Sequence, residues 1–209
     1  MKTPNSVTFA AFADQVNNVR VNCWSKNIKN YLDSLGLTHI WYYQDANADY
    51  FLTIKNRIID QYKQTWLAKI NEMPKLKYYC MFKKEFKYEK YLDVLKYDST
   101  RKAMSRFRLC SHNLEIEFGR FHNIERDERK CRLCNMNAVE SEYHFLLCCP
   151  KFTNLRELYF STTYRSWANT HKFINLLSSE NNVSIIKLGK YLKEAFELRD
   201  QSLIPNNAR

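Results

Sequence analysis

The hydrophobic pattern is clearest in the first half of the chain, where it follows the period of an α-helix. Apolar side chains recur three or four residues apart, at Phe51, Ile54, Ile58, Tyr62, Trp66 and Ile70. This spacing places them on one helix face and predicts a long helix over residues 50–71. Pro74 cannot continue a helix, so we expect the helix to end just before it.

Two further segments carry a helical pattern. The stretch CWSKNIKNYLDSLGL, residues 23–37, predicts a shorter helix that closes near Gly36, because helices commonly end at a glycine. Near the C-terminus the period returns at Ile185, Leu188, Leu192, Ala195 and Phe196. This predicts a closing helix of about four turns, with Asn182 as its N-cap.

Glycine and proline are scarce, which bears on the fold class of the whole chain. Three glycines and four prolines provide too few turn signals for an all-β protein. We therefore expect a mainly α protein built from one or more small helical domains. Its expected parts are an N-terminal helical region (1–74), a basic, metal-binding region (75–165) and C-terminal helices (166–209) that pack on the same core.

The segment STRKAMSRFRLCSHNL, residues 99–114, predicts a helix with a cationic face. At about 100° per residue, its basic side chains share an arc of roughly 160°. They are Arg101, Lys102, Arg106 and Arg108, with Ser105 between them. Such a helix can pack on a core while its cations contact phosphates. An ordinary solvated helix face has the same pattern, so both interpretations stay open.

The charge of the chain is strongly positive and uneven. The net charge is +11, and residues 75–134 hold 16 basic and nine acidic side chains. An excess of this kind attracts polyanions, with nucleic acid or an acidic membrane surface as the usual partners. The stretch KLKYYCMFKKEFKYEKYLDVLK interleaves basic and aromatic side chains, which can stack on bases or belong to the core. We find neither a long apolar run nor a secretory signal, so we expect an intracellular protein, nuclear or cytoplasmic, with no membrane partner.

Four of the seven cysteines lie in the stretch CRLCNMNAVESEYHFLLCCP, residues 131–150, together with a histidine. Cys131 and Cys134 have the interval at which a turn lets two thiolates bind one tetrahedral Zn²⁺. His144 follows, and helical phase pairs it with Cys148, or with Cys149 if the helix loosens before Pro150. The spacing predicts a structural zinc site with four protein ligands and leaves the fourth ligand open. Buried free thiols and a redox or nucleophilic cysteine are the alternatives.

A wider run of residues, from SRFRLCSHNLEIEFGRF through ERDERKCRLC to HFLLCCPKFTNLRELY, resembles a known family. It is similar to the zinc-binding tail that follows the reverse transcriptase domain in non-LTR retrotransposon proteins. The resemblance covers at least residues 99–160. It implies that the metal ligands are Cys131, Cys134, His144 and Cys149, and that Cys148 is not one of them.

The chain lacks the chemistry of the larger retroelement enzymes. No Tyr-x-Asp-Asp motif is present, and the acids of IERDERK are typical of a solvated loop rather than a nuclease centre. We therefore expect a nucleic-acid-binding module, not an enzyme, that takes RNA or DNA with low sequence preference. A reverse transcriptase domain of a parent polyprotein is a further possible partner. The expected binding residues are Arg101, Lys102, Arg106, Arg108, Arg120, Arg129 and Arg132. The alternative is a zinc-stabilised helical domain for protein interaction or structure.

Overall fold

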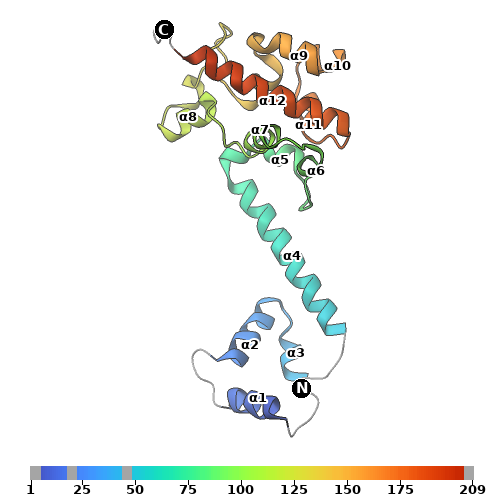
Figure 1. Cartoon of the computed structure of the whole chain (residues 1–209). Coiled ribbons are helices and arrows are strands. Elements are labelled where there is room, and N and C mark those ends of the chain that lie inside the picture. The colour runs from blue at the N-terminus through green and yellow to red at the C-terminus, as the bar shows by residue number, and fades with distance from the viewer. Residues whose placement is uncertain (1–5, 18–22, 44–48, 205–209) are drawn as a thin grey trace. The chain divides into compact units, whose positions relative to one another are not determined.

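The computed structural model describes residues 6–17, 23–43 and 49–204 of the chain. Helices dominate these residues, and the one pairing of extended backbone among them is an isolated antiparallel bridge between Lys130 and Val139. The prediction of a mainly α fold is therefore confirmed. The chain divides into two compact units, Met1–Ala68 and Lys69–Arg209, which are described separately (Figure 1).

The first unit contains three short helices and most of a long one. They are α1 (Val7–Asn17), α2 (Trp24–Ser34), α3 (Thr38–Tyr43) and α4 (Asp49–Glu72). As predicted, α2 closes at Gly36, whose φ of +69° favours glycine. The N–H of Leu37 bonds the carbonyl of Leu32 at 2.9 Å, which completes a Schellman cap. Leu32, Leu35 and Leu37 form a small core, and Ile54 packs against it.

The long helix predicted over residues 50–71 is confirmed as α4, which extends one residue further at each end. Only Ile70 of its apolar stripe is buried, while Phe51 and Tyr62 are exposed. The helical period thus predicted the helix, but it did not predict how many of its apolar side chains are buried.

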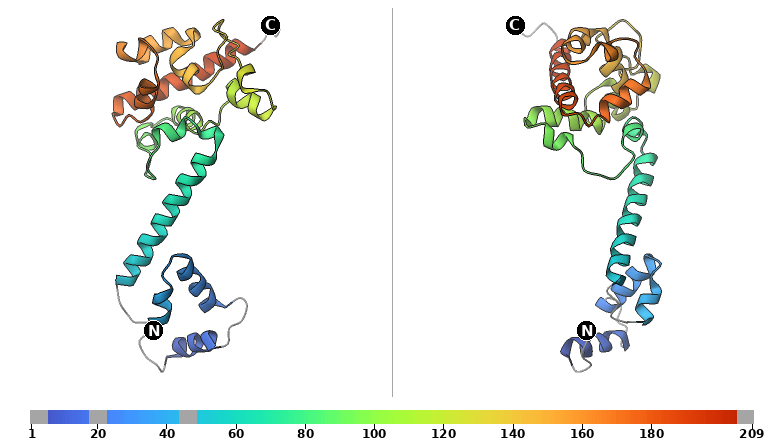
Figure 2. Two further views of the ribbon diagram at one scale, coloured as in Figure 1. Left: turned by 180° about the vertical axis from the view of Figure 1, so that it is seen from behind. Right: turned by 90° about the vertical axis from the view of Figure 1, so that its right-hand side faces the viewer.

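The second unit is built from many short helical segments and one long helix. They are η1 (Pro74–Leu76), α5 (Tyr79–Phe82), α6 (Tyr91–Val94), α7 (Asp98–Arg108), α8 (Glu115–Phe121), η2 (Arg126–Glu128), η3 (His144–Cys148), η4 (Pro150–Phe152), α9 (Thr153–Tyr159), α10 (Thr162–Arg165), α11 (Thr170–Leu177) and α12 (Asn182–Leu203). The long helix α12 lies beside both α7 and α9 (Figure 2). Regions 75–165 and 166–209 therefore share one core.

Two helices differ from their predicted lengths. At 22 residues, α12 makes about six turns instead of four. Its N-cap is Asn181, not Asn182, because the Asn181 side chain accepts the N–H of Ser184. The basic helix predicted over residues 99–114 ends earlier, at Arg108. The chain turns away at Cys110, a residue with a φ of +51°.

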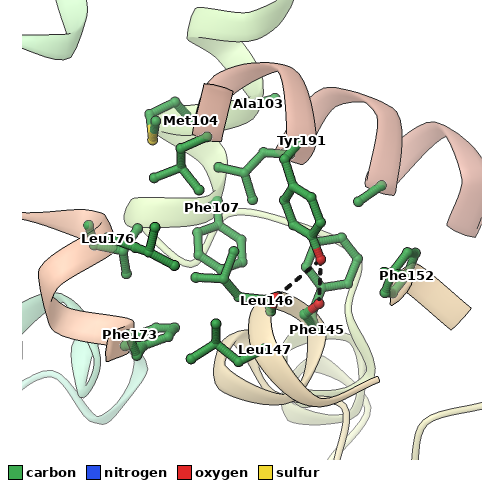
Figure 3. Close-up of a cluster of buried hydrophobic side chains, with 14 of the residues drawn as sticks. Ala103, Met104, Phe107, Phe145, Leu146, Leu147, Phe152, Phe173, Leu176 and Tyr191 are labelled. Carbon is green, nitrogen blue, oxygen red and sulfur yellow. Dashed lines mark hydrogen bonds between the residues drawn. The ribbon is translucent and has the colours of Figure 1, made fainter. Parts of the chain in front are cut away.

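The core of the second unit combines aliphatic and aromatic side chains, and Tyr191 of α12 is one of its buried aromatic residues (Figure 3). The Tyr191 side chain is fully buried, and its hydroxyl points at the turn that carries Phe145 and Leu146. The hydroxyl shares its hydrogen between the carbonyls of these two residues, at 3.0 and 3.2 Å. The core therefore holds the backbone of residues 145 and 146, which lie directly after His144.

Candidate metal centre

The first two cysteines of the motif lie at the start of a short hairpin. The bridge between Lys130 and Val139 closes it, and the N–H of Cys131 bonds the carbonyl of Ala138 at 2.9 Å. The hairpin turns through Asn137, whose φ of +50° suits an asparagine. Cys131 and Cys134 therefore project from one arm of a backbone loop with fixed ends.

A buried ionic network holds the end of this hairpin. Arg199 of α12 donates to both carboxylate oxygens of Glu140, at 2.8 and 2.7 Å. Glu140 also accepts the backbone N–H of Glu115 at 2.7 Å. Because each of these groups is buried and paired, the network fixes the hairpin relative to α8 and α12.

The other two ligand residues belong to a widened helical turn. The segment η3 is a π-helix, in which the N–H of Cys149 reaches back five residues to the carbonyl of His144 at 2.8 Å. Pro150 follows and ends the turn, because it has no N–H to donate. The helix loosens before the proline, and this brings Cys149 toward His144.

The four side chains meet with the spacing of a tetrahedral metal site. The ligand atoms of Cys131, Cys134, His144 and Cys149 all lie within 4.8 Å of one another. A tetrahedral Zn²⁺ with bonds of about 2.3 Å to sulfur and 2.0 Å to nitrogen separates two sulfurs by about 3.8 Å and a sulfur from a nitrogen by about 3.5 Å. The sulfurs of Cys131 and Cys149 are 3.9 Å apart, and Cys134 Sγ is 3.4 Å from His144 Nε2. This cluster can hold a metal ion.

Cys148 is outside the cluster. Its thiol is half-buried, and burial raises its pKa. The structure therefore brings together the ligand set implied by the family resemblance. Helical phase alone left open whether Cys148 or Cys149 joins the cluster, and the structure places Cys149 in it.

The thiols of the cluster influence one another's ionisation. The hydrogen bond with Cys149, together with burial, raises the pKa of Cys131 to about 12. The same hydrogen bond lowers the pKa of Cys149, and burial raises that of Cys134. The sulfurs of Cys131 and Cys149 lie 3.9 Å apart, and either thiol can be the donor. A metal ion must displace thiol protons, because the thiolate is the ligand form.

A buried arginine lies beside the cluster. Arg156 of α9 donates to the carbonyl of Cys149 at 2.6 Å and to Thr153 Oγ1 at 3.1 Å. Its Nη1 is buried without a hydrogen-bond partner, and no described carboxylate forms an ion pair with it. An unpaired buried cation is costly. Three thiolates around a divalent ion carry a net charge of −1, which would compensate it. The cysteine and histidine spacing gave no signal for Arg156.

The seven cations expected to bind nucleic acid do not all lie on one face. Arg108 is buried: it pairs with Glu89 at 2.7 Å, donates to the carbonyl of Leu177 and stacks on Phe82. Its assignment to the solvent face of the helix was therefore wrong. The edge of the cationic arc faces a core formed by segments distant in sequence.

Arg129 also has a role in the fold. Its guanidinium donates to the carbonyls of Ile124 and Ile116, both at 2.9 Å. Gly119 makes room for it, because a Cβ there would lie 2.5 Å from the Arg129 Cγ atom. Arg129 thus ties α8 to the segment before the hairpin.

The other five expected cations retain some exposure. Arg101 and Lys102 both pair with Asp98, whereas Arg120 pairs with Glu117. Arg106 is exposed and bonds the carbonyl of Ser111. Arg132 is exposed and pairs with Glu115. They are therefore spread over α7, α8 and the hairpin.

A pocket of about 630 Å³ gathers two of the expected cations, Arg120 and Arg129, together with three that the sequence did not single out. The basic pocket is lined by Lys75, Lys77, Arg120, Arg126 and Arg129, together with Tyr78 and Glu142. Lys75 Nζ bonds the Oγ atom of Ser111 at 3.3 Å, and Ser111 also accepts from Arg106. The end of α7 therefore adjoins this pocket. Sequence patterns missed it because its cations come from three separate segments.

The fold and the site define a mainly helical protein with a buried Cys3His cluster that can hold a metal ion. No known protein family, curated protein or solved structure matches the chain. Over the ranges 6–17, 23–43 and 49–204, none of the helices has the length and apolar character needed to cross a bilayer.

Proposed function

We propose that the Cys3His cluster binds one Zn²⁺ with a structural role. The donor set of three sulfurs and one nitrogen suits zinc, and the interatomic distances fit a tetrahedron. Four protein ligands leave no position for a substrate, which is typical of structural zinc sites. Zinc would join the hairpin to the turn that carries His144 and Cys149, two segments that share few backbone hydrogen bonds.

We infer that the protein binds nucleic acid through the phosphate backbone. The observation that carries this proposal is the convergence of Lys75, Lys77, Arg120 and Arg126 on the basic pocket. The structure records no ion pair for Lys77 or Arg126 within the described part of the chain, so both are available to phosphates. Contacts to phosphates carry little sequence information, so we expect low sequence preference for either RNA or DNA.

The origin of the protein forms part of the same proposal. The resemblance to the zinc-binding tail of non-LTR retrotransposon proteins supports a module derived from a retroelement. A reverse transcriptase domain of the parent polyprotein would then be a natural partner. Such a module acts in the nucleus or cytoplasm by binding, without polymerase activity of its own.

The test is a titration of mixed-sequence RNA and DNA at several salt concentrations. Each phosphate contact contributes a slope of about −0.7 on single strands and −0.9 on duplex to log affinity against log salt. Replacing Lys75, Lys77 and Arg126 with Ala removes three contacts, so the slope on single strands should become less steep by about 2. The matched control replaces Lys151, Lys187 and Lys190, which are exposed cations outside the pocket. It changes the net charge equally and should retain most of the affinity.

The second candidate function is a zinc-stabilised domain for protein interaction or structure. The roles of Arg108 and Arg129 in the fold favour it, because part of the positive charge serves packing. If the parent protein fails to bind either nucleic acid at low salt, this second function replaces the first. Equal losses in the pocket variant and its control would show that binding does not use the pocket.

A further inference from the structure

A second group of residues with side chains that could hold a metal ion lies around the end of α7, outside the Cys3His cluster. The helix closes with a Schellman cap: the N–H of Ser111 bonds the carbonyl of Arg106 at 2.8 Å, and the N–H of Cys110 bonds that of Phe107 at 3.2 Å. The left-handed position of such a cap usually belongs to glycine. Here it is occupied by Cys110, with a φ of +51°. A side chain there is less favourable than glycine, because its Cβ crowds the following carbonyl oxygen.

The strained position places the Cys110 thiol in a buried polar group with His112 and Glu142. One ligand atom from each of the three residues lies within 4.8 Å of the others. His112 Nε2 is 3.0 Å from Glu142 Oε1, and both side chains are almost completely buried. His112 Nδ1 is also buried and has no hydrogen-bond partner. The protein's own hydrogen bonds thus leave the imidazole incompletely satisfied.

We propose that Cys110, His112 and Glu142 form a second Zn²⁺ site, separate from the Cys3His cluster. Sulfur, imidazole nitrogen and carboxylate oxygen are all common zinc ligands. A thiolate, a carboxylate and a neutral imidazole around Zn²⁺ give a net charge of zero. A neutral group avoids the cost of burying an uncompensated charge in this part of the core. Binding releases the thiol proton to solvent.

The coordination of this site is incomplete with protein ligands alone. Three protein ligands leave a fourth position for water or an anion. Glu142 also lines the basic pocket, so the group adjoins a cavity rich in cations. Burial and the neighbouring Glu142 carboxylate raise the pKa of the Cys110 thiol, so a metal ion would have to displace the thiol proton.

The test counts zinc ions in the full-length chain by elemental analysis after equilibration with Zn²⁺ and removal of loosely bound metal. The parent protein should hold two zinc ions, and Cys110→Gly should hold one. Glycine suits the left-handed backbone, so this variant removes the ligand without adding strain. The matched control is Asn123→Gly, at another position with a positive φ, 54°. It should keep both ions.

A second variant, His112→Gln, covers the case in which Cys110→Gly does not fold. Its amide can still donate to Glu142 but is a far weaker zinc ligand, so it should also hold one ion. One zinc in the parent that Cys110→Gly retains would overturn the second site and leave the Cys3His centre intact. One zinc that Cys110→Gly loses and Cys134→Ser retains would support the second site and refute the Cys3His centre. A parent without zinc would refute both.

Discussion

Replacing Arg156 with Met tests whether the Cys3His cluster binds its metal as thiolates. Arg156 is only 6% exposed, donates to the carbonyl of Cys149 at 2.6 Å and forms no ion pair with any described carboxylate. In the zinc-bound protein, the centre would supply the negative charge that this guanidinium lacks. Groups that support metal ligands in this way typically contribute 10–100-fold to metal affinity. We therefore expect Arg156→Met to weaken zinc binding by this factor, or about 1.4–2.7 kcal/mol.

The same substitution should have the opposite effect on the metal-free protein. Met fills a similar volume and removes a buried charge that has no partner, so the free energy of unfolding in the presence of a chelator should stay level or rise. The matched control is Arg199→Met, since Arg199 is equally buried but paired with Glu140. Breaking that pair should lower stability by about 3–5 kcal/mol, with or without zinc.

Two measurements decide the question. Competition with a chromophoric chelator gives the zinc affinity, and urea denaturation with and without a chelator gives the two stabilities. A zinc affinity of Arg156→Met within about twofold of the parent would refute the charge argument, since even the low end of the expected range is about tenfold. The charge argument would also be refuted if Arg156→Met lowered the stability of the metal-free protein as much as Arg199→Met does.

Three further predictions follow from the same geometry. Cys149→Ser should lose the zinc ion of the Cys3His cluster, which elemental analysis would show as one ion fewer than in the parent, while Cys148→Ser should keep it. The opposite result would make Cys148 the fourth ligand. Arg108→Ala should lower the urea-derived free energy of unfolding by about 3–5 kcal/mol, and the exposed Lys102→Ala by less than about 0.5 kcal/mol. If Arg108→Ala lowered the free energy of unfolding as little as Lys102→Ala does, Arg108 would not belong to the core. Zinc affinity should fall as pH falls, by about tenfold per pH unit for each displaced proton, because thiols such as Cys131, with its pKa of about 12, are protonated without metal. A flat profile from chelator competition would contradict this.

Local sequence signals predicted the elements that depend on local interactions. The period of α4, the proline after it and the glycine that closes α2 each act within a few residues, and each prediction is confirmed. Local spacing also indicated Cys131, Cys134 and His144, because a short hairpin and one turn supply the whole Cys3His set within 19 residues. It left Cys148 and Cys149 open as the fourth member, and only the family resemblance favoured Cys149.

The failures share a different cause. A helical wheel gives the direction of the Arg108 side chain but not the residues that pack against it. Its partners Glu89 and Leu177 lie 19 residues before it and 69 residues after it in the chain. The same limit applies to the basic pocket and to the group of Cys110, His112 and Glu142. Each is assembled from segments that only the tertiary fold brings together, so no local spacing could have indicated it.

The choice of Cys149 over Cys148 shows how the core helps to define the ligand set. Because Cys149 gives its N–H to His144 and Pro150 has none, the carbonyls of Phe145 and Leu146 lack their usual partners within the turn. Unsatisfied, these buried carbonyls would cost about 1–3 kcal/mol each and favour a regular helix that directs Cys148 toward His144. The Tyr191 hydroxyl accommodates both carbonyls from α12, 46 and 45 residues along the chain. The widened turn is therefore stabilised by the core as well as by the proline, and the core thereby places Cys149 beside Cys131.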